Sequence, residues 1–392
     1  MNTFEIDKEY VAGTYNRFPV EIASGKGSVV KDPTGKEYID MGSGIGVTAF
    51  GIADEEWQKA VIDQISKVQH MSNLYYTEPC AKLAELLCRK TGMKKVFFCN
   101  SGAEANECAI KVARKYASDK WAKVHEGPCE RYTIVTLKNS FHGRTLTTLA
   151  ATGQDHYHEL FQPLTPGFAH VEAGNMDELK ALAAQTPIAG VLIECVQGEG
   201  GVIPLDREYI QAVRKFTEEN DIIMMVDEVQ TGNGRSGELY AYMNFGIQPD
   251  VISTAKGLAG GLPLGATLLS EKVQNVLGFG DHGSTFGGNP VSCAAGYSIL
   301  SRIDEKCLAD VKAKSKYVFE SLQGAAGVES VSGLGLMIGI KTVKPAGEVL
   351  KTCMENGVLC LTAKDKVRLL PALNIPMDVL EKAITVIKEA CK

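Results

Sequence analysis

Two charged residues each close an apolar run that has the composition of a buried strand. Asp227 follows IIMMV at 222–226, and Lys256 ends the run VISTAK at 251–256. Open α/β sheets bind their ligands at the carboxyl ends of the strands, so we expect both side chains at one sheet edge. A buried carboxylate needs a partner there, although an aspartate in such a place also serves as a cap and a lysine is usually a solvated surface group. The stretch GLAGGLPLG at 257–265 has little side-chain bulk, which leaves room for a large ligand beside Lys256.

The segment NSGAEANE, at 100–107, is a candidate phosphate site. It is expected to lead from a strand through a small-residue turn into a helix, whose first amides would point at an anion. The same residues fit a capping box, with Ser101 as the cap and Glu104 three residues later. Both interpretations hold together, because a capped helix start still offers its dipole and free amides. A Schiff-base lysine and an aspartate for a pyridinium nitrogen are the protein groups that pyridoxal phosphate requires, so these residues predict a site for it.

Two other motifs imitate nucleotide sites. A GxGxxG match at Gly232, Gly234 and Gly237 comes soon after a strand and would suggest a dinucleotide site. Residues 228–231 separate it from the strand, and no long helix with an apolar stripe follows, so an NAD-dependent oxidoreductase is a distant alternative. The run IIMMVDE imitates the metal-holding strand of a nucleotide hydrolase, but the sequence has no GxxxxGK[ST] loop.

The sequence predicts no metal site. Its eleven cysteines are scattered, with no CxxC pair and no Cys/His metal spacing, and we expect most of them to be small buried hydrophobic residues. His156 and His158 have a spacing seen in metal sites, but no third ligand is apparent. Surface histidines are the simpler interpretation.

The alternation of apolar runs and helical patterns predicts how these residues are positioned. From about residue 94, short β-branched or apolar runs alternate with amphipathic patterns, which is typical of a mostly parallel sheet. The stretch FGIADEEW at 50–57 is expected to open a helix with Asp54 as its cap. The expected strands are Val96–Cys99, Tyr132–Leu137, Gly190–Cys195, Ile222–Val226, Val251–Thr254 and Ala266–Leu269, and the expected helices in this part cover 54–68, 79–87, 108–116 and 209–216.

The composition changes at 278–290, where GFGDHGSTFGGNP holds five glycines and a proline, and we place a domain joint there. We expect 1–57 to be an N-terminal segment that contributes to a small domain, 58–284 to be the large cofactor-binding domain, and 285–392 to be the small C-terminal α+β domain. In that tail the pattern predicts helices at 291–303, 311–322, 348–354 and 379–387, and strands at 331–341, 358–361 and 367–370.

Length and charge exclude several classes of protein. The 392 residues correspond to about two or three domains. A net charge of −6 argues against an extensive nucleic-acid or anionic-membrane surface. The longest apolar runs fall short of the ~18 residues that span a bilayer, and the start MNTFEIDKEY lacks the apolar stretch of a secretory signal. We therefore expect a cytoplasmic protein with no nucleic-acid or membrane partner.

Six motifs together resemble the class III aminotransferases. They occur in the order of that family and span most of the chain: NSGAEANECAIK from 100, FHGRT at 141–145, ECVQGEGG at 194–201, DEVQTGNGR at 227–235, TAKGLAGGLPLG at 254–265 and STFGGNP at 284–290. The resemblance implies the α/β fold of type I pyridoxal-phosphate transferases, with a large mostly parallel sheet domain and a smaller α+β domain. It also implies a homodimer, or a larger assembly, whose active sites lie at the subunit interface.

The same resemblance implies roles for individual cofactor-site residues. Lys256 would form the Schiff base and move the proton during transfer, and Asp227 would pair with the ring nitrogen. Phe141 would stack on one ring face, although it also fits a core aromatic. The remaining expected cofactor contacts are Val229 on the other ring face, Gln230 at the phenolic oxygen, Ser101, Gly102 and Ala103 at the phosphate, and Thr285 of the partner subunit, also at the phosphate.

Substrate residues follow from the resemblance too. Arg144 would bind the carboxylate remote from the reacting carbon, and Ser284 would contact substrate. Arg368 would bind the α-carboxylate of glutamate, with Glu199 neutralising it when the substrate amine has no carboxylate beside it. For the last two residues an ordinary static ion pair is the alternative, and an isolated arginine such as Arg144 is usually a surface group.

Family members that act on N2-acetylornithine, with 2-oxoglutarate as the acceptor, are most similar to this chain in SNLYYTEP at 72–79, GIGV at 44–47 and VRLLPAL at 367–373. Members specific for free ornithine place a tyrosine near Gly44, and this chain has none there. Transfer from N-succinyldiaminopimelate, alone or as a second activity, is the nearest alternative. A pyridoxal-phosphate-binding protein without transaminase activity is a further one.

Overall fold

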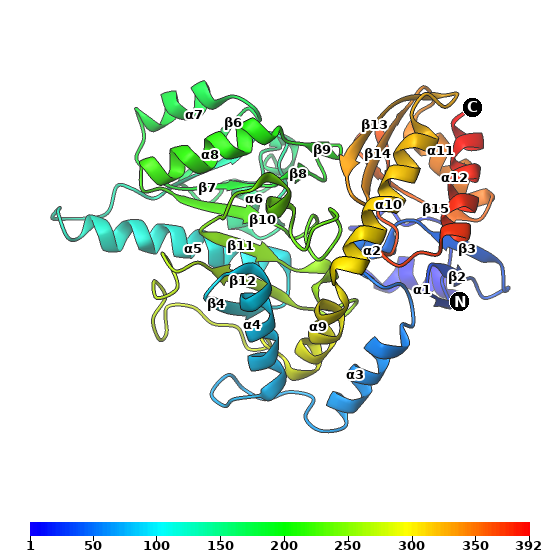
Figure 1. Cartoon of the computed structure of the whole chain (residues 1–392), viewed down its shortest axis with the longest axis horizontal. Helices are drawn as coiled ribbons and strands as arrows, with labels where there is room; N and C mark the ends of the chain where they lie inside the picture. Colours follow the sequence, from blue (N-terminus) through cyan, green and yellow to red (C-terminus); the bar gives the residue numbers. More distant parts are fainter.

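The computed structural model describes residues 1–392, and its centre is a seven-stranded sheet (Figure 1). The strand order is β4-β12-β11-β10-β7-β5-β6. Only β12 runs against its neighbours, so the expected mostly parallel sheet is confirmed. The six expected strands all form, within two residues of the expected ends, and β6 is an additional edge strand. The strands are β4 (Lys95–Cys99), β5 (Thr133–Leu137), β6 (Phe168–Val171), β7 (Ile188–Ile193), β10 (Ile223–Asp227), β11 (Val251–Thr254) and β12 (Gly265–Leu269).

Alternation along the strands builds a hydrophobic core on each face of this sheet. In β10, Ile223 and Met225 pack in the cluster formed with α5 (Gly102–Trp121). Met224 and Val226 point to the other face, into the cluster that includes residues of α8 (Arg207–Glu219). Because successive side chains of a strand point to opposite faces, a continuous apolar run of this kind is suited to a strand covered on both sides. In Figure 1, α5 lies on one side of the sheet and α7 (Met176–Ala183) with α8 on the other.

A second region contains two small sheets built from both ends of the chain. One has the order β1-β2-β3-β15, in which β3 pairs in parallel with β15 and so joins the N-terminal segment to the tail. The other has the order β13-β14-β17-β16. The elements of this region are α1 (Thr3–Tyr10), β1 (Ser24–Lys26), β2 (Val29–Lys31), β3 (Glu37–Asp40), α10 (Glu305–Leu322), β13 (Val328–Leu334), β14 (Met337–Thr342), α11 (Ala346–Glu355), β15 (Val358–Leu359), β16 (Leu361–Ala363), β17 (Lys366–Leu369) and α12 (Met377–Cys391).

The expected single strand at 331–341 is wrong, because the structure has a hairpin of β13 and β14 there. Gly335 turns the chain with a φ of 61°, a conformation that favours glycine. A Cβ at this position would lie 2.3 Å from the carbonyl oxygen of Arg235. Likewise, the single expected strand at 358–361 divides into β15 and β16, which belong to different sheets. In both places the apolar pattern runs through the turn and so hides it.

Helix α3 (Glu55–Ile65) begins as expected, with the Asp54 carboxylate accepting a hydrogen bond of 2.9 Å from the backbone N–H of Trp57. The indole N–H of Trp57 donates to the carbonyl oxygen of Ala259 at 2.8 Å, which ties this helix to the glycine-rich loop after Lys256. The stretch FGIADEEW at 50–57 therefore leads into a capped helix, as expected. No helix of the structure is both long and apolar enough to cross a membrane.

Helix α9 (Pro290–Arg302) bears on the division into domains. It packs against α3 and α4 (Glu78–Thr91) rather than against the two small sheets. We therefore propose a joint after α9, near Ile303, in place of the boundary expected at 284–285. The remaining short elements are α2 (Ser43–Gly46), α6 (Leu146–Ala151), η1 (Asp155–Tyr157), β8 (Val196–Gln197), β9 (Ile203–Pro204), η2 (Ala241–Phe245) and η3 (Lys256–Leu258).

Candidate active site

A cavity of about 380 Å³ lies at the carboxyl ends of the parallel strands. Residues that follow β4, β5, β7, β10 and β11 meet there, as expected for an open α/β sheet. Eight of the nine predicted cofactor residues line this cavity, and the ninth, Thr285, does not. The eight are Ser101, Gly102, Ala103, Phe141, Asp227, Val229, Gln230 and Lys256.

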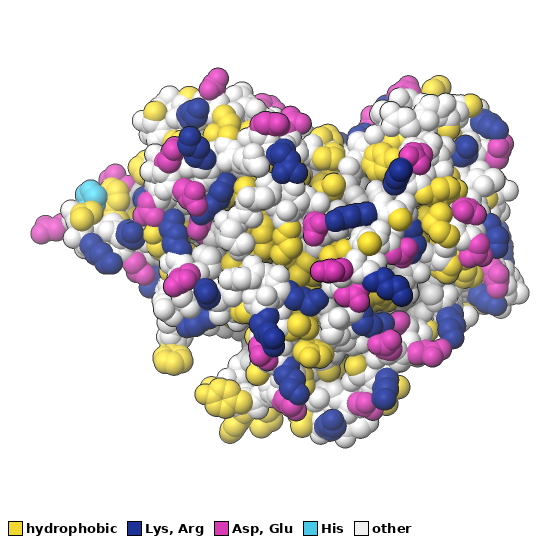
Figure 2. Space-filling view, in the orientation of Figure 1, with side chains coloured by type: hydrophobic (Ala, Val, Ile, Leu, Met, Phe, Trp, Pro, Cys, Tyr) yellow, Lys and Arg dark blue, Asp and Glu magenta, His cyan; other side chains and the backbone are white.

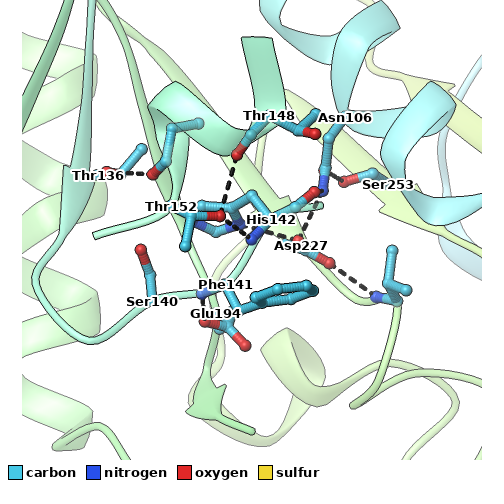
Figure 3. A network of polar contacts seen from close by, with 12 residues as sticks. Asn106, Thr136, Ser140, Phe141, His142, Thr148, Thr152, Glu194, Asp227 and Ser253 are labelled. Carbon is cyan, nitrogen blue, oxygen red and sulfur yellow. Dashed lines mark hydrogen bonds and ion pairs between the residues drawn. The ribbon is translucent and has the colours of Figure 1, made fainter. Parts of the chain in front are cut away.

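Asp227 ends β10 and is held by three donors (Figure 3). Its Oδ2 atom accepts from Asn106 Nδ2 at 2.7 Å and lies 2.9 Å from His142 Nδ1. Its Oδ1 atom accepts from the backbone N–H of Val229 at 2.9 Å. A carboxylate only accepts, so His142 must carry its proton on Nδ1 and donate it. The buried charge thus has the partners that it requires, and its orientation is fixed.

Sequence reasoning missed His142 and Asn106 as site residues. Both are buried and both line the cavity. Asn106 accepts a hydrogen bond from Ser253 Oγ, and its Nδ2 also donates to the carbonyl oxygen of His142 at 2.8 Å. The only available signal was their place inside the motifs NSGAEANE and FHGRT. An aspartate expected to be buried at a strand end would also have justified a search for donors among them.

The start of α5 has the capped geometry expected from its sequence. Ser101 Oγ accepts from the backbone N–H of Glu104 at 3.2 Å and donates to Glu104 Oε2 at 2.9 Å. That carboxylate also accepts from the backbone N–H of Asn100 at 3.0 Å. Ser101, Gly102 and Ala103 line the cavity at this helix end, where dipole and amides favour an anion.

Two apolar side chains, Phe141 and Val229, line the same cavity as Asp227 and Lys256. Gly102 packs directly on Val229, since a Cβ at position 102 would lie 2.6 Å from Val229 Cγ1. Glycine at the start of α5 therefore lets the helix approach the cavity wall closely.

Lys256 follows β11 with a φ of 42°, an unusual conformation for a residue other than glycine. Burial in the cavity lowers the pKa of its amine below the usual value, and the negative charges of Asp227 and Glu199 oppose this shift in part. A larger share of the amine is therefore neutral, and nucleophilic, at a given pH than in a surface lysine.

This shift predicts the pH dependence of labelling. In cofactor-free protein, Lys256 should react with a limiting amine-directed reagent at a lower pH than Lys26, an exposed lysine whose pKa is raised by Glu55. The measurement is the labelled fraction of each lysine, by peptide mass spectrometry, between pH 7 and 10. The same pH profile for both lysines would contradict the assignment of a lowered pKa.

Arg368 and Glu199 form an ion pair beside the cavity. Arg368 is buried in β17, and its Nη1 lies 2.5 Å from Glu199 Oε1. Gln230 joins both, because its Nε2 donates to Glu199 Oε1 at 3.2 Å and its Oε1 accepts from Arg368 Nη1 at 3.2 Å. Although burial alone would raise the pKa of Glu199, the charge of Arg368 and its hydrogen bond bring it below the usual value. Arg368 Nε is buried without any partner, so one edge of the guanidinium keeps unused donor capacity.

The other three predicted substrate or cofactor residues do not line this cavity, although Ser284 Oγ accepts a hydrogen bond of 3.1 Å from Nδ2 of Asn100, a residue that lines it. Arg144 is exposed and stands 4.6 Å over the ring of Tyr157 and 5.5 Å over that of Phe141. Ser284 and Thr285 line a separate cavity of about 590 Å³. Within one chain, therefore, these three residues are not part of the lining of the cavity that contains Lys256.

The alternative motifs find no support in the structure. Residues 232–240 form turns and bends with no long helix after Gly237. Gly232 and Gly234 are packing positions, since a Cβ would lie 2.6 Å from the Tyr240 ring and 2.9 Å from Leu373. No group of three or more His, Cys, Asp or Glu side chains is arranged to hold a metal ion.

Comparisons with known proteins agree with the resemblance to class III aminotransferases that the six sequence motifs show. The family model for "Aminotransferase class-III" matches residues 10–391. An acetylornithine aminotransferase of Haemophilus ducreyi is 49% identical over 387 residues, covering 98% of this chain and 97% of its own. Among solved structures, N-acetylornithine aminotransferase of Stenotrophomonas maltophilia has a TM-score of 0.85 at 31% identity, covering 99% of this chain and 98% of its own. Ornithine aminotransferase of Toxoplasma gondii has a TM-score of 0.93 at 28% identity, covering 99% and 94%. With the motifs gathered around one cavity and nearly the whole chain matched, this protein belongs to the class III aminotransferase family.

Proposed function

We propose that this chain is a pyridoxal-phosphate-dependent acetylornithine aminotransferase. It transfers the terminal amino group of N2-acetyl-L-ornithine to 2-oxoglutarate, which gives N-acetyl-L-glutamate 5-semialdehyde and L-glutamate, a step of arginine biosynthesis. The observation that carries the proposal is the Glu199–Arg368 ion pair near Lys256. Arg368 would bind the α-carboxylate that lies beside the reacting amine of glutamate. Glu199 would pair with Arg368 when the substrate, such as acetylornithine, has no carboxylate beside its reacting amine. The identity of 49% to an enzyme of that name supports the choice of substrate.

The residues present fit pyridoxal phosphate. A volume of about 380 Å³ is within the range of small-molecule sites. The cavity is lined by the start of α5, whose amides suit a phosphate, and by Asp227, whose oriented carboxylate suits a ring nitrogen. Lys256 supplies an amine of lowered pKa for the carbonyl carbon. The bound cofactor would supply the electron sink for the reaction.

The chain's own groups then bind substrate and move the proton. Once the substrate amine has displaced it, the Lys256 amine acts as the general base at the reacting carbon of the substrate. Phe141 and Val229, which line the cavity, would pack against the bound cofactor. Arg368 binds the α-carboxylate of glutamate bidentately, a geometry natural to a guanidinium.

Free ornithine and N-succinyldiaminopimelate are the competing substrates. The high TM-score to an ornithine aminotransferase means that overall shape does not discriminate between these substrates. The discriminating feature is local: the resemblance implies a tyrosine near Gly44 in ornithine-specific members, and this chain has none there. An acylated α-amine needs no such partner, which favours an acyl substrate over ornithine but not acetyl over succinyl.

Visible absorbance tests the proposal. The purified, cofactor-supplemented protein should show the band of a lysine-bound cofactor, and N2-acetylornithine should convert it to the amine form of the cofactor. Ornithine and N-succinyldiaminopimelate are added to separate samples. Conversion by ornithine alone would overturn the substrate assignment, and equal conversion by the succinyl compound would make the enzyme bifunctional. A stable band that no ω-amine changes would indicate a binding protein without transaminase activity.

We also propose a homodimer in which each site receives Thr285 and Ser284 from the partner subunit. Both residues line a surface cavity together with Leu74, an apolar side chain that is 88% exposed. Tyr76 and Phe279, two further apolar side chains of this chain, are fully exposed. Figure 2 shows hydrophobic side chains projecting at the lower margin of the molecule, below α4. Exposed apolar patches of this kind mark protein interfaces. Asn73 Nδ2 donates to the carbonyl oxygens of Ser284 at 3.0 Å and of Gly287 at 2.8 Å, so hydrogen bonds hold the backbone of the segment 284–287 in place.

Mixing two inactive variants tests the shared site. Lys256→Ala and Thr285→Glu should each be inactive alone, the second because its carboxylate would repel the cofactor phosphate. In a mixed dimer, the site with an intact Lys256 would receive an intact Thr285 from its partner. Activity should therefore return, towards about half per mixed dimer. A chain that elutes as a monomer, or mixed dimers without activity, would overturn the shared site.

A further inference from the structure

Glu194 is a buried carboxylate in the cavity to which neither the sequence nor the proposed reaction gives a role. It follows β7 and is 6% exposed. It contacts no lysine or arginine, so its partners are backbone groups. Oε2 accepts from the N–H of Phe141 at 3.0 Å, and Oε1 accepts from the N–H of Gly198 at 3.2 Å. Burying a carboxylate costs free energy of folding, so the two hydrogen bonds that Glu194 makes indicate what the residue does.

The first contact fixes an aromatic wall of the cavity. Phe141 follows β5 in an irregular segment, where no ladder hydrogen bond holds its backbone. Its N–H is bonded to Glu194 instead, and its ring lies 5.7 Å from that of Tyr157, edge to face. Figure 3 shows the Glu194 carboxylate at the backbone of Phe141, beside the network around Asp227. The position of the Phe141 ring over the cavity therefore depends on this carboxylate.

The second contact fixes the turn that carries Glu199. Gly198 packs against the amide of Gln230, since a Cβ there would lie 2.6 Å from Gln230 Oε1. That amide bonds both Glu199 and Arg368. One oxygen of Glu194 thus holds the backbone of Phe141, which lines the cavity, and the other holds the backbone of Gly198, which precedes Glu199.

We propose that Glu194 is a positioning residue that holds Phe141 and the Gly198–Glu199 turn in register with each other. The inference rests on the proposed function only for the role of the ion pair; the wall formed by Phe141 serves any bound pyridoxal phosphate. Glu194 acts through backbone groups and does not itself take part in proton transfer.

Glu194→Gln tests this role, because glutamine keeps the size but offers one oxygen and one NH₂ group. One of the two backbone N–H groups then loses its acceptor and faces a donor. Titration of the cofactor-free protein with pyridoxal phosphate should show a dissociation constant raised about tenfold. The kcat/KM values for the glutamate and acetylornithine half-reactions should fall at least tenfold.

Glu228→Gln is the matched control. Burial raises the pKa of both Glu194 and Glu228 to about 7, but Glu228 bonds Thr231 and the backbone of Tyr242 and does not line the cavity. It should lower the melting temperature while the cofactor dissociation constant stays within about twofold. Equal cofactor losses in both variants, or none in Glu194→Gln, would overturn the proposal. If Glu194→Gln does not fold, Glu194→Asp, with both acceptors on a shorter arm, replaces it in the same comparison.

A double-mutant cycle with Phe141→Leu separates positioning from general damage. If Glu194 acts through Phe141, its substitution should weaken cofactor binding less in the Phe141→Leu background than in the natural chain. Additive losses would contradict the link. Cofactor affinity and the glutamate half-reaction do not involve acetylornithine, so a failure of the substrate assignment leaves this test intact.

Discussion

Replacing Lys256 by alanine is expected to abolish transamination, with a loss of about 10⁴-fold or more in kcat. Two functions disappear at once, because the same amine binds the cofactor carbonyl and moves the proton at the substrate carbon. The amine lies in a buried cavity where no other lysine is present to replace it. The measurement is single-turnover absorbance with acetylornithine and, separately, with glutamate.

The control for this result is a comparison of folding and of chemical rescue. Lys256→Ala should keep its cooperative thermal transition, since a lysine with its amine in a cavity contributes little packing. A small primary amine added at high concentration should restore part of the rate, because it supplies the missing base. Lys26→Ala, on the surface, should retain full activity. A Lys256→Ala protein that transaminates at the natural rate would remove the mechanism altogether.

The large sheet could be predicted because its strands are covered on both faces. A continuous run such as 222–226 has few alternatives when it is short and bounded by turns, and its carboxyl end then locates Asp227. The same logic places Lys256 one strand away, and β10 and β11 do pair in parallel. Adjacent parallel strands therefore bring together residues 29 positions apart, as the sequence predicts.

The hydrogen-bond donors that hold Asp227 and the turns within the small sheets could not be predicted in this way. His142 and Asn106 reach Asp227 across 85 and 121 residues of sequence, and no periodic pattern encodes such side-chain contacts. The hairpin at Gly335 was missed because apolar residues continue through the turn, which a backbone contact with Arg235 fixes. Local patterns give elements, whereas these features depend on tertiary packing.

We propose that the ion pair of Glu199 and Arg368 allows one cavity to accept two dissimilar donors. Arg368 is buried, and a guanidinium without a partner at such a site is costly. Glu199 is the more exposed partner, with a side chain 28% exposed against 5% for Arg368, so in this proposal Glu199 is the residue that moves. Gln230 bonds both and would keep a contact with Arg368 after Glu199 moves.

Glu199→Ala is accordingly expected to separate the two half-reactions. With acetylornithine, Arg368 stays buried and uncompensated, so kcat/KM should fall about 10- to 100-fold, which corresponds to about 1.4 to 2.8 kcal/mol. With glutamate, the substrate carboxylate replaces the lost one, so kcat/KM should change less than about threefold and KM should fall. Arg368→Ala should give the reverse pattern, because glutamate then loses its partner while acetylornithine does not. A static ion pair predicts instead that Glu199→Ala weakens both half-reactions equally, and stopped-flow absorbance with each donor distinguishes these outcomes.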